Sequence, residues 1–168
     1  AGMNYVAKQR GRTAETNIDT LRKEKYLGLG TFFKTGELFD MELLFDKLPN
    51  GEQPFDYDTF MNSDQHFLMS TVNCNTGLPV YYNQFRDKQQ LMRIARASNS
   101  LPFISKKVNI DGIPMLDGGM YDAIPIDKAL EEGLEKVIVI YTRLGDYRKV
   151  KRHLYMFLLR IIYRKYPN

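Results

Sequence analysis

The stretch I-P-M-L-D-G-G-M-Y-D-A-I-P-I-D-K-A-L, Ile113 to Leu130, places one acid, Asp117, directly before two glycines. A short extended run follows, and Pro125 then opens a predicted helix. The acid has two interpretations. In the first, Asp117 accepts a hydrogen bond from its own backbone in a tight turn, and Gly118 or Gly119 supplies a positive φ. In the second, the glycines give the backbone freedom beside a carboxylate that has a chemical role.

The residues around this stretch predict a mixture of paired strands and helices. The run before Asp117 pairs with the preceding extended run across Asp111-Gly112, which is a good short hairpin signal. Strands alternate with helices toward the C-terminus, so the predicted fold class is α/β. We expect a second hairpin of 66–72 with 80–82, helices at 3–8, 14–25, 88–97 and 126–132, short helices at 32–49 that form a cap or pocket wall, and a parallel-type strand at 137–141.

Length and composition favour one domain, residues 1–168. The chain is 43% apolar and 12% aromatic, which is enough to bury a sizeable core. Its single cysteine, Cys74, excludes an internal disulfide framework, fits a reducing compartment and is predicted to be a small, buried or partly exposed side chain. No apolar run reaches the roughly 18 residues of a spanning helix, and the N-terminus lacks a signal-peptide pattern.

The net charge of +4 is unevenly distributed along the chain. Residues 143–168 contain eight Lys or Arg against one acid, Asp146, so this segment carries +7 and the rest of the chain −3. The spacing of its apolar residues predicts an amphipathic helix. This basic segment can pack as a terminal helix with a solvated edge, or it can lie on an anionic bilayer. Nucleic acid is not an expected partner, because no recognised motif accompanies the cations.

Other reactive side chains are not spaced for catalysis or metal binding. His66 and His153 lie far apart and lack neighbours at zinc-ligand spacing, so both are predicted to be structural and no metal is expected. The L-G-L-G run at 27–30 lacks the final glycine of a dinucleotide-binding loop, so no nucleotide cofactor is expected either. The acids at 56, 58, 131 and 132 are predicted to be solvated.

The stretch from Arg96 to Arg143 resembles the second half of a bacterial patatin-like phospholipase. It has R-A-S and L-P before the acid, P-I-D-K-A-L after it, and T-R after V-I-V-I-Y. That family carries a serine on a G-x-S-x-G elbow and an aspartate in a D-G-G or D-G-A motif. Asp117, Gly118 and Gly119 match the second motif. The resemblance extends to Q-R-G-R at 9–12 and Y-R-K-Y-P at 163–167, and so covers nearly the whole chain.

The resemblance implies a three-layer α/β/α fold that is incomplete here at the N-terminal end and at the C-terminal end. The family's elbow often reads G-x-S-A-G and leads into a helix. Ala1 and Gly2 would then be its last two residues, and the serine would lie just before residue 1. The amide of Ala1 would contribute to the oxyanion hole, whose glycine-rich part would lie further upstream. The 168-residue chain alone is therefore expected to be inactive.

The activity implied by the resemblance is hydrolysis of lipid acyl esters, of the phospholipase A or lysophospholipase type, by a Ser-Asp dyad. Asp117 would take the serine proton directly. Because the ordinary pKa of aspartic acid is about 3.9, partial desolvation should raise its basicity while backbone hydrogen bonds orient it. The expected partners are a lipid ester and an anionic membrane surface, and the expected location is the cytoplasm or the inner face of the membrane.

Two other classes of function remain open. A protein that binds lipid or membrane without turnover is supported by the basic segment at 143–168. A scaffold that keeps only the fold has no sequence feature in its support. The aromatic and Met-rich residues at 32–45 can line an acyl pocket or belong to the core.

Overall fold

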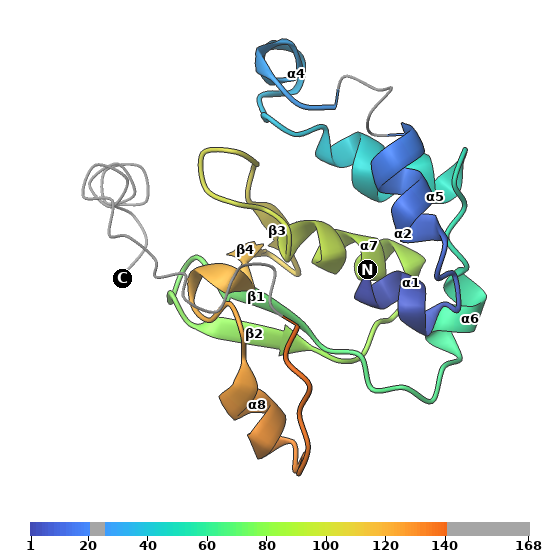
Figure 1. Ribbon diagram of the computed structural model, residues 1–168. Coiled ribbons are helices and arrows are strands. Elements are labelled where there is room, and N and C mark those ends of the chain that lie inside the picture. Colours follow the sequence, from blue (N-terminus) through green and yellow to red (C-terminus); the bar gives the residue numbers. More distant parts are fainter. Residues whose placement is uncertain (21–25, 141–168) are drawn as a thin grey trace.

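The computed structural model describes residues 1–20 and 26–140, and it contains a small sheet with helices around it (Figure 1). The predicted basic segment at 143–168, His153 and residues 21–25 of the predicted helix at 14–25 lie outside the described residues. The elements of the described part are α1 (Gly2–Val6), α2 (Arg12–Ala14), η1 (Glu15–Thr20), α4 (Leu29–Thr35), η2 (Leu43–Lys47), α5 (Leu48–Asn50), α6 (Tyr57–Met61), β1 (Met69–Asn73), β2 (Pro79–Tyr82), α7 (Lys88–Ala97), β3 (Val108–Ile110), β4 (Ile113–Asp117), η3 (Gly118–Met120) and α8 (Ile126–Glu131).

The strands pair in the order β2-β1-β4-β3, and each of these pairs is antiparallel. Both predicted hairpins are confirmed. Asp111 and Gly112 have φ values of 50° and 84°, and two consecutive positive φ values are what a two-residue type I′ turn requires. The central pair sets Thr71 of β1 opposite Asp117 of β4. The end of β4 therefore lies beside the middle of β1.

Helix α7 forms as predicted and supplies much of the core. Asp87 caps its N-terminus by accepting a hydrogen bond of 2.7 Å from the Gln90 N–H. Its apolar face packs against β1, β3 and β4, and Leu91 and Ile94 are fully buried there together with Met115 of β4. Burying each of these side chains contributes about 1.5–3 kcal/mol to stability. The helix is thus fixed against the strand that ends at Asp117.

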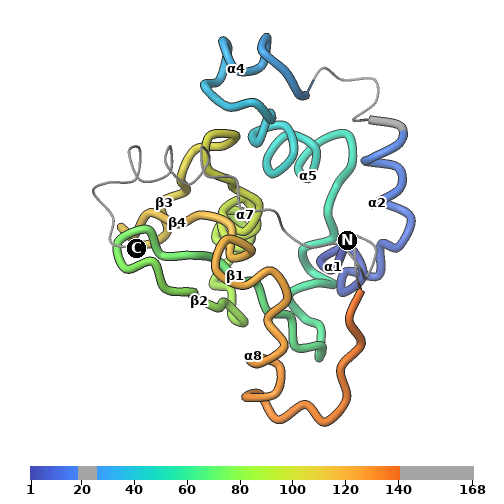
Figure 2. The backbone as a smooth tube through the Cα atoms, turned by 60° about the vertical axis from the view of Figure 1, so that its left-hand side comes forward, coloured from blue at the N-terminus to red at the C-terminus, as the bar shows by residue number. Residues whose placement is uncertain are grey.

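The predicted short helices at 32–49 are confirmed as α4, η2 and α5. Gly36 ends α4 in the left-handed conformation, with φ of 74°. Met41 is buried whereas Phe33 is 83% exposed, so only part of this region belongs to the core. Helix α4 lies at one end of the molecule, and α8 lies at the other (Figure 2).

The segment 137–140, predicted to begin a parallel-type strand, does not form one. These residues have no regular secondary structure, and Ile138 and Ile140 are 92% and 86% exposed. A buried parallel strand needs parallel neighbours, and all strand pairs in the described part of the chain are antiparallel. Tyr141, the last residue of the predicted strand, lies outside the described residues. The preceding helix α8 is confirmed, with Pro125 at its start.

Candidate active site

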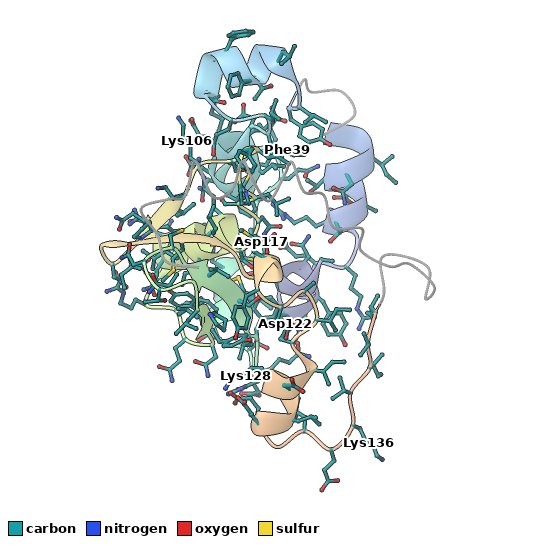
Figure 3. The ribbon with its side chains drawn as sticks, turned by 90° about the vertical axis from the view of Figure 1, so that its left-hand side faces the viewer. Phe39, Lys106, Asp117, Asp122, Lys128 and Lys136 are labelled. Atoms are coloured by element: carbon teal, nitrogen blue, oxygen red, sulfur yellow. The ribbon has the colours of Figure 1, made fainter. Side chains whose placement is uncertain are left out.

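Asp117 is the last residue of β4, and hydrogen bonds with two neighbouring backbone groups determine its position. Its N–H donates to the carbonyl of Ser100 at 2.9 Å, just beyond the end of α7. Its Oδ1 accepts from the Gly119 N–H at 2.8 Å, at the start of η3. Figure 3 shows Asp117 near the middle of the molecule, with Asp122 between it and Lys128, which lies on α8. The carboxylate is therefore attached to a rigid element and oriented by a short turn.

The environment of Asp117 makes it more basic than an ordinary aspartate. Burial disfavours its charged form and raises the pKa, and the hydrogen bond from the Gly119 N–H opposes this rise without cancelling it. The side chain is half-buried. These are the two effects expected from the sequence for a carboxylate that acts as a base. No ion pair to Asp117 occurs among residues 1–20 and 26–140.

The glycine after Asp117 is required by a close contact, and not by a positive φ. A Cβ on Gly118 would lie 2.6 Å from the backbone carbonyl carbon of Ser70 and would also overlap the Ser70 hydroxyl. Gly118 and Gly119 form a 3₁₀ turn, and neither has a positive φ. The positive φ expected of one of them is therefore wrong. The tight turn of the first interpretation is nevertheless present, since the Asp117 side chain accepts a hydrogen bond from the Gly119 N–H.

Gly119 also lies close to the carboxylate. A Cβ at this position would lie 3.2 Å from Asp117 Oδ1. Such a contact is tighter than ordinary van der Waals distance, so a side chain here would crowd the acid. The two glycines thus have different roles. Gly118 lets β1 pack closely against the turn, and Gly119 leaves the space beside the carboxylate free of a side chain.

Ala1 and Gly2 lie at the start of α1, where Ala1 is exposed. A Cβ on Gly2 would lie 2.9 Å from Phe67 Cε2, so this glycine too is placed by a close contact. Within the described residues no hydrogen bond or ion pair joins Ala1 or Gly2 to Asp117. Phe67 precedes Thr71, the partner of Asp117, by four residues, which is about 13 Å along an extended chain. The segment 67–71 thus runs from a residue that contacts α1 to the strand position opposite Asp117.

Sequence reasoning missed the two serines that hold the D-G-G turn. Ser70 lies on β1 against Gly118, and Ser100 accepts from the Asp117 N–H. Ser100 is fully buried, and its hydroxyl donates to the Arg96 carbonyl at 2.8 Å. Isolated serines carry no periodic signal, and their role depends on strand pairing across a long stretch of chain.

The remaining predicted residues are placed as follows. Cys74 is buried, and the acids at 56, 58, 131 and 132 are exposed, as predicted. His66 is exposed just before β1. No helix among the described residues is long and apolar enough to cross a membrane. The same residues contain no group of three or more His, Cys, Asp or Glu arranged to hold a metal ion.

The chain is similar in sequence to known proteins. Residues 8–130 match the family of patatin-like phospholipases. The chain is also 28% identical over 142 residues to the uncharacterized protein YjjU of Escherichia coli (strain K12), and this similarity covers 82% of the present chain and 39% of YjjU. The chain belongs to the patatin-like phospholipase family, whose chemistry at the family level is hydrolysis of lipid acyl esters. The match includes the D-G-G turn at 117–119 but not Ala1 and Gly2.

Proposed function

We propose that this chain carries the catalytic base of a serine acyl hydrolase that acts on lipid esters, with Asp117 as the base and the nucleophilic serine just before Ala1. The observation that carries the proposal is the state of Asp117. Its carboxylate is desolvated and oriented by one backbone N–H in a turn that closes only because residue 118 is glycine. The family match supports the reaction class.

The proposed reaction begins with attack of the serine hydroxyl on the ester carbonyl. The proton passes to Asp117, whose Oδ1 is held by Gly119 and whose Oδ2 makes no hydrogen bond within the described residues. The amide of Ala1, at the start of α1, contributes one donor to the developing oxyanion. Asp117 then gives the proton to the leaving alcohol. A water next attacks the acyl-enzyme, Asp117 takes a proton from this water, and the proton returns to the serine oxygen as the fatty acid leaves.

The first prediction tests Asp117 in a longer protein that restores the segment before residue 1. Asp117→Asn should lower hydrolysis of p-nitrophenyl acyl esters by roughly 10² or more, because the amide keeps the shape of the side chain but cannot take the proton. Activity of the unchanged protein should fall on the acid side with a pKa above that of ordinary aspartic acid. The 168-residue chain itself should show no turnover.

The matched control is Asp122→Asn, because Asp122 accepts from the Ile124 N–H at 3.0 Å in a turn of the same spacing. This variant should keep its activity. Near-normal activity of folded Asp117→Asn, or turnover by the 168-residue chain that survives Asp117→Ala, would return Asp117 to the role of a turn residue.

A second proposal, from a different class, is a protein that binds lipid without turnover. It is favoured by the cationic residues at 143–168, which lie outside the described residues. Paired assays separate the two proposals. The longer protein is tested for sedimentation with vesicles and for ester hydrolysis. If it does both, the enzyme is supported. If it sediments with vesicles but hydrolyses no ester, the lipid-binding protein is supported. If the protein acts at the inner face of the membrane, as either proposal allows, it should co-fractionate with membranes at low salt. High salt should release it from them.

A further inference from the structure

A cavity of about 1060 Å³ lies between η2 and α5 on one side and α7 and β3 on the other. Its volume is at the upper end of the range typical of small-molecule sites. Asp117 does not line it. The cavity is built from elements that pack directly against one another, since α7 contacts both η2 and β3. Most of its polar lining residues are exposed, so it is an open cleft between these elements.

The charged side chains of this cavity are mostly cationic. Helix α7 contributes Lys88, Arg93 and Arg96, and the segment before β3 contributes Lys106 and Lys107. The lining includes a single carboxylate, that of Asp46. A cavity lined by one sign of charge concentrates ligands of the opposite sign. The cavity therefore favours an anion.

The contacts of these cations leave an excess positive charge. The guanidinium of Arg96 is neutralised by the buried Glu37, with Nη2 and Oε2 2.9 Å apart. Lys106 Nζ donates to the carbonyl of Thr35, an uncharged partner (Figure 3 labels Lys106). Lys88 lies 5.9 Å from the centre of the Tyr57 ring, also uncharged. Arg93 makes no hydrogen bond or ion pair with any residue in 1–20 or 26–140.

The apolar part of the lining lies beside the cations and consists of Met41, Phe45, Met92 and Val108. The uncharged polar residues of the lining are Asn50, Tyr57, Gln89 and Asn109. Lys88, Met92 and Arg96 follow one another at four-residue steps, so charge and apolar surface share one face of α7. Methionine side chains are flexible and adapt to ligands of irregular shape. An inorganic anion would leave this apolar wall in contact with water.

We propose that this cavity binds a single-chain anionic amphiphile, a fatty acid or a monoacyl phosphate. The anionic head lies among Lys88, Arg93 and the lysines before β3, and the chain lies over Met41, Phe45 and Met92. The choice of ligand class rests on the proposed function, because hydrolysis of a lipid acyl ester releases molecules of this kind. The site itself rests on the charge and the lining of the cavity.

The test measures binding and needs no turnover. The 168-residue chain and the longer protein are titrated with cis-parinaric acid, a fluorescent fatty acid, which is feasible because the sequence contains no tryptophan to interfere. Oleate and oleoyl glycerol phosphate are then tested as competitors of the probe. Methyl oleate, hexanoate and inorganic phosphate are tested separately as competitors that lack the charge, the long chain and any chain, respectively. Oleate should displace the probe far better than its uncharged methyl ester or the short hexanoate. The two charged long-chain competitors distinguish a carboxylate head from a phosphate head.

Two sets of variants examine the two halves of the site. Lys88→Gln with Arg93→Gln should weaken binding of the probe about tenfold or more, because two charge-assisted contacts are lost. The control pair, Lys34→Gln with Lys136→Gln, removes the same charge from exposed residues that do not line the cavity and should leave binding within about twofold. Met92→Gln should weaken binding of parinarate but not change the weak binding of hexanoate.

Several outcomes would overturn the proposal. Equal binding by the cavity variants and the control pair would place the ligand elsewhere. Equal displacement by oleate and methyl oleate would remove the role of the cations, and displacement by millimolar phosphate alone would reduce the cavity to an anion site. Thermal unfolding of each variant shows that it is folded. Loss of ester hydrolysis in Asp117→Asn with unchanged probe binding would separate this site from the proposed reaction.

Discussion

Asp117 illustrates how one residue can be costly for the fold and useful for chemistry. Burial raises its pKa, and a hydrogen bond from Gly119 keeps it oriented. Because the pKa is higher in the folded state than in the unfolded chain, the favourable contribution of this group is present at low pH. It is lost as the pH rises through the folded-state pKa. At neutral pH the ionised carboxylate therefore reduces stability.

The second prediction follows from that sign. Asp117→Asn should raise the melting temperature at pH 7, since the neutral amide is less costly to bury and can still accept from the Gly119 N–H. The difference from the unchanged chain should shrink as the pH falls below about 4, where the carboxyl is protonated in both states. Thermal unfolding followed by circular dichroism at several pH values measures it, with Asp122→Asn as control. A lower melting temperature of Asp117→Asn at pH 7 would contradict the assignment of burial as the main effect.

The third prediction concerns Gly118. Gly118→Ala should destabilise the chain by about 1–3 kcal/mol, because its Cβ would overlap both backbone and side chain of Ser70 and β1 would have to shift. Gly30→Ala is the control, because this glycine lies in α4 and a Cβ there meets nothing within 4 Å. The control should be neutral or slightly stabilising. Chemical denaturation of the two variants gives the comparison, and equal stabilities would show that the contact with Ser70 is easily relieved.

At the scale of elements, Glu37 joins three segments that are far apart in sequence. It follows α4, its Oε2 pairs with Arg96 at the end of α7, and its Oε1 accepts from the Lys106 N–H at 2.8 Å. Glu37 is only 4% exposed. The two contacts of Glu37 fix both ends of the loop that carries Ser100. The carbonyl of Ser100 accepts the hydrogen bond from the Asp117 N–H. The position of the candidate base thus depends on a contact with the N-terminal helices.

The fourth prediction compares this buried ion pair with an exposed one. Glu37→Gln should destabilise the chain by about 3–5 kcal/mol, because it leaves the Arg96 guanidinium without its charge partner. The control, Arg86→Gln, breaks a pair with Asp111 that is as short, 2.7 Å, but whose side chains are 67% and 57% exposed. It should cost about 0–1 kcal/mol. Urea titrations of both variants measure the difference. Similar small effects would show that solvent reaches the Glu37 pair.

At the scale of the whole molecule, positive charge is concentrated in two parts of the chain. The cavity beside α7 is cationic, and the segment 143–168 adds a net charge of +7 outside the described residues. Cations near an anionic bilayer each contribute on the order of 1 kcal/mol, and this attraction weakens with salt. A packed helix with a solvated edge would show no such dependence.

The fifth prediction therefore uses the longer protein with Arg148, Lys149, Lys151 and Arg152 replaced by glutamine. Binding to anionic vesicles at low salt should fall by more than tenfold, and binding to zwitterionic vesicles should change little. The control carries four glutamine substitutions at exposed cations elsewhere, at Lys8, Arg10, Lys34 and Lys136. Equal binding of the two variants to anionic vesicles at low salt would identify the basic segment as a solvated edge and place the lipid-binding surface elsewhere.

Local sequence determined the hairpins, α7, α8 and the D-G-G turn, because turn residues and side-chain spacing act over about ten residues. Asp111-Gly112 specifies its turn without help from the rest of the chain. Only the tertiary structure decided that Gly118 is required by Ser70, that Glu37 pairs with Arg96, and that cations of α7 and of the segment before β3 line one cavity. It also decided that 137–140 does not form a strand, although its composition favours one. These features depend on which distant segments meet, and a strand or a close contact exists only where another part of the chain supplies its partner.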